Sequence, residues 1–307
     1  MRLIMKKVIS VFLCAVLLFT LSMTAFAADE KPFSDSYFFT SGDYTIHYRL
    51  SEHKGDFKGR IVMLHGFGQS SFSWQNMAAQ MSGKGYDCYA VDLPNFGYST
   101  RETAEITHID RETLVEQLML SIAPAEEWTV AGHSMGGGVA INIAEDLNVK
   151  ALFLVCPAPT TALPEFAGKI VTSKPLGLMM NFVLEKLTKI DFLMRIVVFA
   201  ATQNKEYTKN YDLSGVTAPL QQKGTGMGLC YMLKDVRVTE LDKTDRITCP
   251  VLIFNAEKDM VLRGGMKEQV LDAFPNAELC EVQGAGHICH EDRAEEMAEI
   301  TYNFLNK

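Results

Sequence analysis

The chain has 307 residues, of which 48% are hydrophobic and 21% are charged. This composition excludes a disordered chain, and the length suffices for one large core or for a core with an added subdomain. The formal net charge is −8. Because an acidic surface repels nucleic acid and anionic lipid, we expect no nucleic-acid partner.

The first 27 residues have a basic start, an apolar run and a short stretch of small residues. This order is typical of a secretory signal peptide with cleavage after Ala27, so we expect a secreted or extracytoplasmic protein. Cleavage would change the net charge from −8 to −11. An uncleaved segment that anchors the protein stays an alternative, and it is the only membrane contact we expect. The basic start consists of Arg2, Lys6 and Lys7, the apolar run covers residues 8–19, and the small residues are in Ala25-Phe26-Ala27.

After this segment, residues 37–40 and 44–49 flank Ser41-Gly42-Asp43, a pattern that predicts an antiparallel hairpin. Residues 60–64 form a continuous apolar run of the kind found in a strand buried on both faces, so we expect a parallel sheet. Strand-like and helix-like stretches then alternate. Further strands are expected at 86–91, 127–131, 151–156, 250–255 and 277–282. Helices are expected at 74–81, 110–121 and 139–144, after Asp259 as far as residue 273, and at the C-terminus.

Two of these helices have an apolar side that we expect to face the core. The helix at 110–121 carries Leu114, Leu118 and Ser121 on this side, and the C-terminal helix carries Met297, Ile300 and Phe304.

The alternation stops between residues 157 and 246, where Met-rich apolar positions recur at helical spacing with few strand signals. We expect this stretch to be a helical cap, inserted between two parts of an α/β core at 28–156 and 247–307. The Met-rich apolar positions could pack in a core or could form a surface that binds a ligand, and both alternatives stay open. Gly224, Gly226 and Gly228 do not form a phosphate loop, because no strand precedes them.

The central motif is Gly132-His133-Ser134-Met135-Gly136, which predicts a strand, a sharp turn and a helix. A nucleophile on such a turn is forced toward positive φ, and its neighbours two places away must lack side chains. Ser134 and the two flanking glycines meet this demand. Because this pattern arises by chance in about one chain in ten, the case depends on partner residues elsewhere.

Asp259 and His287 supply these partners. Both follow predicted strands, as Ser134 does, and the carboxyl ends of parallel strands meet at one edge of a sheet. A serine hydroxyl needs an imidazole to take its proton, and the imidazole needs a carboxylate to fix its tautomer. We therefore expect these three side chains to form a catalytic triad.

These motifs resemble the α/β-hydrolase fold family, in its branch with one cap domain after the sixth strand, from about residue 37 to the end of the chain. The resemblance implies a mostly parallel eight-stranded sheet flanked by helices. His65-Gly66-Phe67-Gly68 resembles the oxyanion loop of the family, so the backbone amides of Phe67 and Met135 are expected to hold the oxyanion. The elbow is most similar to those of monoacylglycerol lipases and carboxylesterases.

The resemblance also covers the stretch from Asp92 to Ser99, which is similar to a structural turn after the fourth strand of the family. Asp259 and His287 match the family's acid and base. Asn255-Ala256 stands where many relatives carry a glycine, which leaves Glu257 as the alternative acid.

From these residues we expect a secreted serine hydrolase of small hydrophobic carboxylic esters, without a cofactor or metal. Three other readings stay open: an amidase or aminopeptidase, a cofactor-free perhydrolase or haloperoxidase, and a binding protein with negligible turnover. The amidase would read a substrate amine with Glu165, Glu185 or Glu206.

The remaining histidines and cysteines have simpler readings. His133 is expected to support the elbow and His65 to order the oxyanion loop. A metal pair of His287 and His290 with Glu291 is the weaker alternative. The six cysteines after residue 27 are expected to be mostly unpaired buried thiols, because Cys88, Cys156 and Cys280 lie in apolar strand-like runs. Their spacing shows no metal-type pattern.

Overall fold

The computed structural model describes residues 31–103, 106, 108–262 and 265–307. The predicted signal segment lies outside these residues and stays a prediction. Within the described part, none of the helices combines the length and the apolar character that a membrane span needs. The unit Asp35–Lys307 contains the elements described below.

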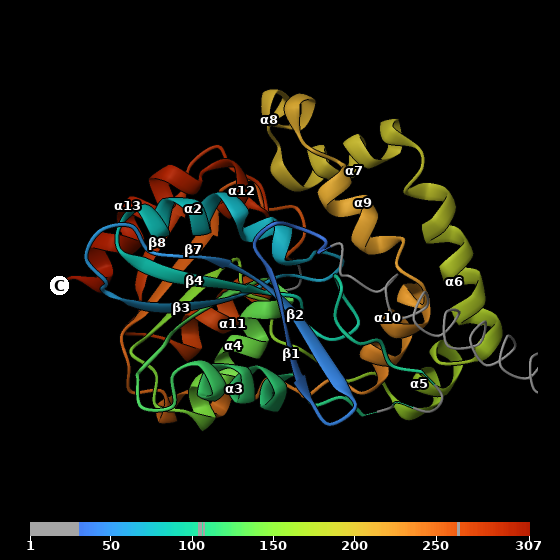
Figure 1. Cartoon of the computed structure of the whole chain (residues 1–307), viewed down its shortest axis with the longest axis horizontal. Helices are drawn as coiled ribbons and strands as arrows, with labels where there is room; N and C mark the ends of the chain where they lie inside the picture. The colour runs from blue at the N-terminus through green and yellow to red at the C-terminus, as the bar shows by residue number, and fades with distance from the viewer. Residues whose placement is uncertain (1–30, 104–105, 107, 263–264) are drawn as a thin grey trace, which may run out of the picture. The chain divides into compact units, whose positions relative to one another are not determined.

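An eight-stranded sheet runs through this unit in the order β1-β2-β4-β3-β5-β6-β7-β8. β1 and β2 form the predicted antiparallel hairpin, β2 pairs antiparallel with β4, and the neighbours from β4 to β8 are parallel. The predicted mostly parallel sheet is confirmed (Figure 1). The strands are β1 (Ser36–Ser41), β2 (Tyr44–Ser51), β3 (Gly59–Leu64), β4 (Tyr86–Val91), β5 (Thr129–His133), β6 (Ala151–Val155), β7 (Val251–Ala256) and β8 (Glu278–Val282).

Helices cover both faces of the sheet, because the central strands are apolar on both sides (Figure 1). Along β3, Val62 and Leu64 pack into the core cluster under α3, α4 and α11, whereas Ile61 and Met63 pack into the cluster under α2, α12 and α13. The helices are α2 (Gln75–Gly83), preceded by the short η1 (Ser71–Trp74), α3 (Arg111–Ile122), α4 (Met135–Asp146), α11 (Met266–Ala273), α12 (Cys289–Asp292) and α13 (Ala294–Leu305).

One predicted helix face needs correction. In α3, Ser121 is exposed, and the buried side instead carries Leu114, Val115, Leu118 and Met119. Positions i, i+1, i+4 and i+5 lie along one side of a helix, and the apolar side chains at these positions gain most from burial.

In α13 the predicted inner face is confirmed, since Met297 is fully buried and the half-buried Ile300 and Phe304 pack against the same core cluster. Ala298 and Thr301 are buried as well. These small side chains allow α13 to lie close against its neighbours.

Between β6 and β7 the chain forms only helices, and no strand occurs in residues 157–246, all of which are described. We call this segment the helical insert. Figure 1 shows its helices beside the sheet, on the right of the view. They are α5 (Glu165–Val171), α6 (Lys174–Leu187), α7 (Asp191–Thr202), α8 (Lys205–Asn210), α9 (Ser214–Leu220) and α10 (Thr225–Lys234), followed by the short η2 (Leu241–Arg246).

Gly226 shows what the glycines of this insert do. A Cβ at this position in α10 would lie 2.4 Å from the backbone nitrogen of Asn181 in α6. The glycine therefore permits close helix packing, and no phosphate loop is present in this stretch of described residues.

Candidate functional site

Ser134 sits at a strained turn between β5 and α4. Its backbone has φ 51° and ψ −122°, which confirms the predicted positive φ. A Cβ at Gly132 would lie 2.3 Å from the carbonyl oxygen of Gly136, and a Cβ at Gly136 would lie 2.4 Å from that of Leu64. The turn therefore closes only because both flanking residues lack side chains.

Asp259 and His287 follow β7 and β8 and contact each other. The Nδ1 atom of His287 donates a hydrogen bond of 2.7 Å to Oδ2 of Asp259. The other carboxylate oxygen accepts from the backbone amides of Val261 at 2.7 Å and Leu262 at 3.1 Å. These bonds fix the carboxylate, and they place the proton of the neutral imidazole on Nδ1, so Nε2 is left as the basic nitrogen.

The contact between His287 and Asp259 also shifts the pKa values of both groups. Burial alone would lower the pKa of His287, but the hydrogen bond to Asp259 and the contact with the Cys156 thiol outweigh burial and raise this pKa to about 9. Burial would raise the pKa of Asp259, and the hydrogen bonds from His287 and the two amides lower it below its usual value. The site therefore favours a charged imidazolium next to a carboxylate.

Ser134 and His287 both line a cavity of about 420 Å³ between the sheet edge and the helical insert. In the described residues, no hydrogen bond joins the Ser134 hydroxyl to His287. Such contacts are often longer before a substrate binds. The insert supplies an apolar wall to this cavity: Leu184, Met194, Val197, Val198, Ala201, Val216, Leu220 and Leu229.

The predicted oxyanion donors belong to the same cavity region. Phe67 lines the cavity, and Met135 is the first residue of α4, so its amide is one of the helix-start donors without an acceptor inside the helix. His65 orders the loop as expected. Its Nε2 accepts from the backbone amide of Leu93 at 3.1 Å, so Nδ1 donates to the carbonyl oxygen of Gly66 at 2.8 Å.

Gln69 fixes this loop from its other end, a role that the sequence did not reveal. Its side-chain oxygen accepts from the amide of Gly66 at 3.0 Å and lies 2.7 Å from Nδ1 of His133. The side-chain nitrogen therefore donates to Glu291, at 3.1 Å. His133 also places Nε2 3.0 Å from the carbonyl oxygen of His287. The oxyanion loop, the elbow and the residue that carries the base are thus connected.

Glu291 is a buried carboxyl group in the wall of the cavity. Burial raises its pKa to about 8, although hydrogen bonds with the hydroxyls of Tyr211 and Tyr207 and with Gln69 oppose this rise. Both tyrosines come from the insert. Sequence patterns could not predict this cluster, because Glu291, Gln69 and the two tyrosines come together only in the fold.

The weaker metal reading, with His287, His290 and Glu291, finds no support in the geometry. His290 is fully buried between the rings of Trp74 and His133, at centroid distances of 4.4 and 4.3 Å, and burial lowers its pKa to about 3. Glu291 is held by Gln69 and the tyrosines.

The described residues whose ligand atoms do converge are Cys156, Asp259 and His287, within 4.8 Å of one another. A hydrogen bond with Cys289 and burial raise the pKa of the Cys156 thiol, which opposes the thiolate that a metal needs. The Nδ1 atom of His287 is also engaged with Asp259. All six cysteines of the described residues are free, and four are buried: Cys88, Cys156, Cys230 and Cys289.

The alternative acids lie away from the cavity. Glu257 accepts from the amide of Gly284 at 2.7 Å at an exposed position. Glu165, Glu185 and Glu206 are exposed on the insert, and none of them lines the cavity. The prediction that one of these three would read a substrate amine is therefore not matched by their positions.

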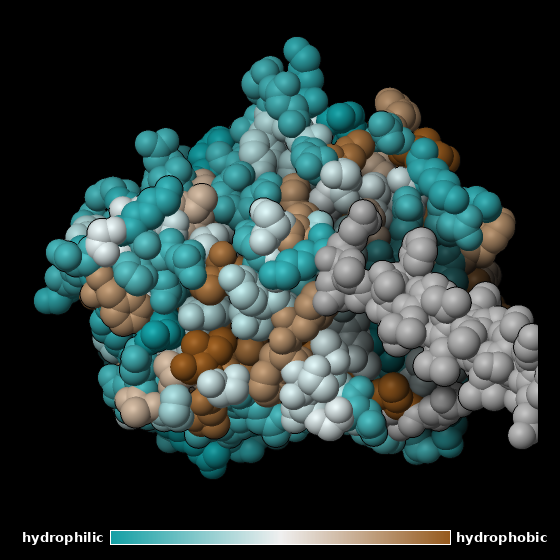
Figure 2. All heavy atoms as spheres, in the orientation of Figure 1, coloured by the Kyte–Doolittle hydropathy of each residue, from teal (hydrophilic) through white to brown (hydrophobic). Residues whose placement is uncertain are grey.

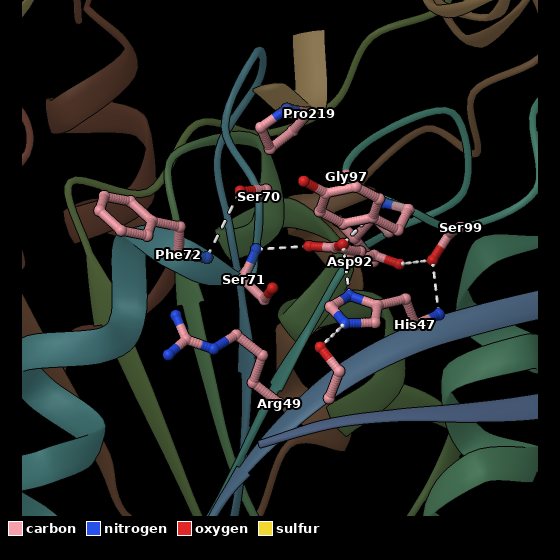
Figure 3. A network of polar contacts seen from close by, with 12 residues as sticks. His47, Arg49, Ser70, Ser71, Phe72, Asp92, Gly97, Ser99 and Pro219 are labelled. Carbon is pink, nitrogen blue, oxygen red and sulfur yellow. Dashed lines mark hydrogen bonds and ion pairs between the residues drawn. The ribbon is translucent and has the colours of Figure 1, made fainter. Parts of the chain in front are cut away.

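A second Ser-His-Asp chain lies elsewhere in the protein (Figure 3). His47 contacts Asp92 through Nδ1 at 2.6 Å and Ser36 through Nε2 at 2.7 Å, with all three side chains fully buried. Asp92 also accepts from the amides of Ser71 at 2.5 Å and Tyr98 at 2.8 Å. This network ties the turn after β4 to β1 and β2, which agrees with a structural role.

The doubly covered parallel sheet, with polar side chains after β5, β7 and β8, defines an α/β protein whose site lies at the carboxyl edge of the sheet. The family model of the alpha/beta hydrolase fold matches residues 59–294, and the chain belongs to this family. The resemblance to the α/β-hydrolase fold family is confirmed.

The curated relatives of the chain are distant in sequence. The chain is 22% identical over 273 residues to the uncharacterized hydrolase YugF of Bacillus subtilis (strain 168), with 87% of this chain and 96% of that protein covered. It is 23% identical over 264 residues to Lipase 3 of Moraxella sp. (strain TA144), with 81% and 76% covered. The crystal structure of the enol-lactonase from Burkholderia xenovorans LB400 superimposes with a TM-score of 0.68 at 16% identity, covering 88% of this chain and all of that one. The chain is thus a hydrolase of the α/β fold with esterase- and lipase-like relatives.

Proposed function

We propose that the protein hydrolyses carboxylic esters with hydrophobic acyl groups, with Ser134 as the nucleophile. The observation that carries this proposal is the shared cavity of Ser134 and His287, next to the hydrogen bond between His287 and Asp259. The apolar wall from the insert supports an acyl chain as the bound group. The helical insert would act as the cap of this site.

In this mechanism Nε2 of His287 takes the hydroxyl proton while the Ser134 oxygen attacks the ester carbonyl carbon. The carbonyl oxygen becomes negative and is held by the amides of Phe67 and Met135. As the carbon–oxygen bond to the alcohol breaks, His287 returns the proton to the leaving oxygen. Water, deprotonated by His287, then releases the acid from Ser134.

Asp259 supports both half-reactions without taking part in bond making. Its carboxylate keeps the proton of neutral His287 on Nδ1 and stabilises the imidazolium that forms.

A panel of p-nitrophenyl esters from acetate to decanoate tests the proposal, with aminoacyl p-nitroanilides as the competing substrates. We expect ester turnover to be lost in Ser134→Ala and kcat/KM to rise with acyl length. Faster anilide turnover would overturn the ester assignment.

We also propose that residues 1–27 are removed during export. Expression of the full chain with its native N-terminus, followed by N-terminal sequencing of the exported protein, tests this. A mature chain that begins at Ala28 supports the proposal, and a retained Met1 supports the anchored alternative.

A further inference from the structure

Three consecutive helices of the insert direct large apolar side chains toward the solvent. Phe192 and Phe166 are 71% and 70% exposed. We call this set the apolar face, and part of it is visible at the upper right of Figure 2 over α6 and α7. Its members are Phe166 and Ile170 from α5, Leu178, Met179 and Phe182 from α6, and Phe192, Leu193, Ile196 and Val197 from α7.

The spacing shows that the face is a continuous feature of each helix. On α7 the exposed apolar positions fall at i, i+1, i+4 and i+5, which is one side of a helix, while Met194 and Val198 are buried on the other side. A surface helix normally places polar residues on its solvent side. An apolar patch that spans several helices instead marks a surface with a partner.

Basic residues accompany this face. Residues 165–197 contain five Lys and Arg but three Asp and Glu, although the whole chain has a net charge of −8. The Nζ atom of Lys186 lies 5.3 Å from the ring centroid of Phe182. Glu165 pairs with Lys169 at 2.8 Å and Glu185 with Lys189 at 3.0 Å, so these charges cancel and residues 165–197 keep a surplus of two positive charges. Apolar side chains flanked by lysines are typical of helices that lie in a lipid interface.

The apolar face reaches the cavity of Ser134. Val197 is 59% exposed and also lines that cavity, as do the exposed Val261 and Phe67. A hydrophobic molecule could therefore pass from the face to the site without crossing a polar surface.

We propose that the apolar face docks on a phospholipid surface, with α5, α6 and α7 lying in its plane. The delivery of a lipid-dissolved ester to Ser134 rests on the proposed function, whereas the docking does not. The charges favour this occupant over two others. A symmetric second copy would bring two positively charged segments together, and the N-terminal segment carries Arg2, Lys6 and Lys7, which are also positive. Headgroup phosphates complement the lysines.

Co-sedimentation of the full chain with phosphatidylcholine vesicles, with and without phosphatidylglycerol, tests the docking. We expect the wild type to bind, the double variant Phe192→Glu/Ile196→Glu to bind at least tenfold more weakly, and Ser134→Ala to bind normally. The last result separates docking from hydrolysis. A matched control is Leu120→Glu/Leu279→Glu, which places two glutamates at leucines about as exposed as Ile196, on α3 and β8, and it should bind within twofold of the wild type.

Hydrolysis of a short water-soluble p-nitrophenyl ester reports folding in the wild type and in the two glutamate double variants, because none of their substituted residues lines the cavity. Vesicle binding that survives in Phe192→Glu/Ile196→Glu would overturn the proposal and point to the N-terminal segment. A wild type that does not bind vesicles would also overturn it. So would a wild-type dimer that becomes monomeric in Phe192→Glu/Ile196→Glu.

Discussion

The Nδ1 atom of His287 lies 2.7 Å from the Oδ2 atom of Asp259, although α11 and β8 separate the two residues in the chain. The carboxylate is fixed by two backbone amides as well. This relationship makes Asp259, and not the nearby Glu257, the group that orients His287.

Asp259→Asn should lower kcat by roughly 10³ to 10⁴-fold, because the amide no longer fixes the productive tautomer of His287. Ester hydrolysis at saturating substrate measures this effect. Glu257→Gln is the matched control, and its kcat should stay within twofold of the wild type. The reverse pattern would assign the acid to Glu257.

The pH dependence follows from the raised pKa of His287. A general base must be neutral, so kcat/KM should fall as the pH drops through this pKa, with a midpoint between 6.5 and 9. Asp259→Asn removes the main stabilising partner of the imidazolium and should move the midpoint down by at least one unit. A wild-type midpoint below 6.5, measured from kcat/KM profiles, would contradict the role of the pair.

Asp92 should contribute to stability in a pH-dependent way. Burial raises its pKa, but the hydrogen bond with His47, the nearby imidazole charges and the amide of Ser71 outweigh burial and lower it to about 2, from 3.8. The stabilisation is therefore present above pH 3.8 and is lost as the pH falls toward 2. Asp92→Asn should lower the free energy of unfolding at pH 7 by about 2 kcal/mol, as measured by urea denaturation. Asp56→Asn, at an exposed site, should change it by less than about 0.5 kcal/mol.

The elbow should not tolerate a methyl group. Gly136→Ala would place Cβ 2.4 Å from the carbonyl oxygen of Leu64, so we expect a loss of about 1–3 kcal/mol in stability and a much larger loss of activity. Gly83→Ala is the control, since a Cβ there meets nothing within 4 Å at the end of α2. It should be neutral or stabilising by up to about 1 kcal/mol. An active Gly136→Ala enzyme would refute the close approach of strand and helix.

The sequence predicted the elements that depend on local pattern. The apolar run of β3 and the glycines around Ser134 encode a parallel sheet and a sharp turn directly, because few other structures accommodate them. The approach of Asp259 to His287 followed from topology, since parallel strands end at one edge. Their catalytic roles stay predictions.

Other features could not be predicted because they depend on which residues the fold brings together. Helical spacing places Met194 and Phe192 in one apolar segment, but it does not say that the first is buried and the second exposed. The contacts of Glu291 with Gln69 and Tyr211 join distant parts of the chain, and no local signal marks them.

Labelling with a fluorophosphonate, followed by intact-mass and peptide analysis, tests the central claim most directly. The account predicts one label per chain, located on Ser134, with no label and no ester hydrolysis in Ser134→Ala. A wild type that resists the label, or a Ser134→Ala variant that still reacts and hydrolyses esters, would contradict it.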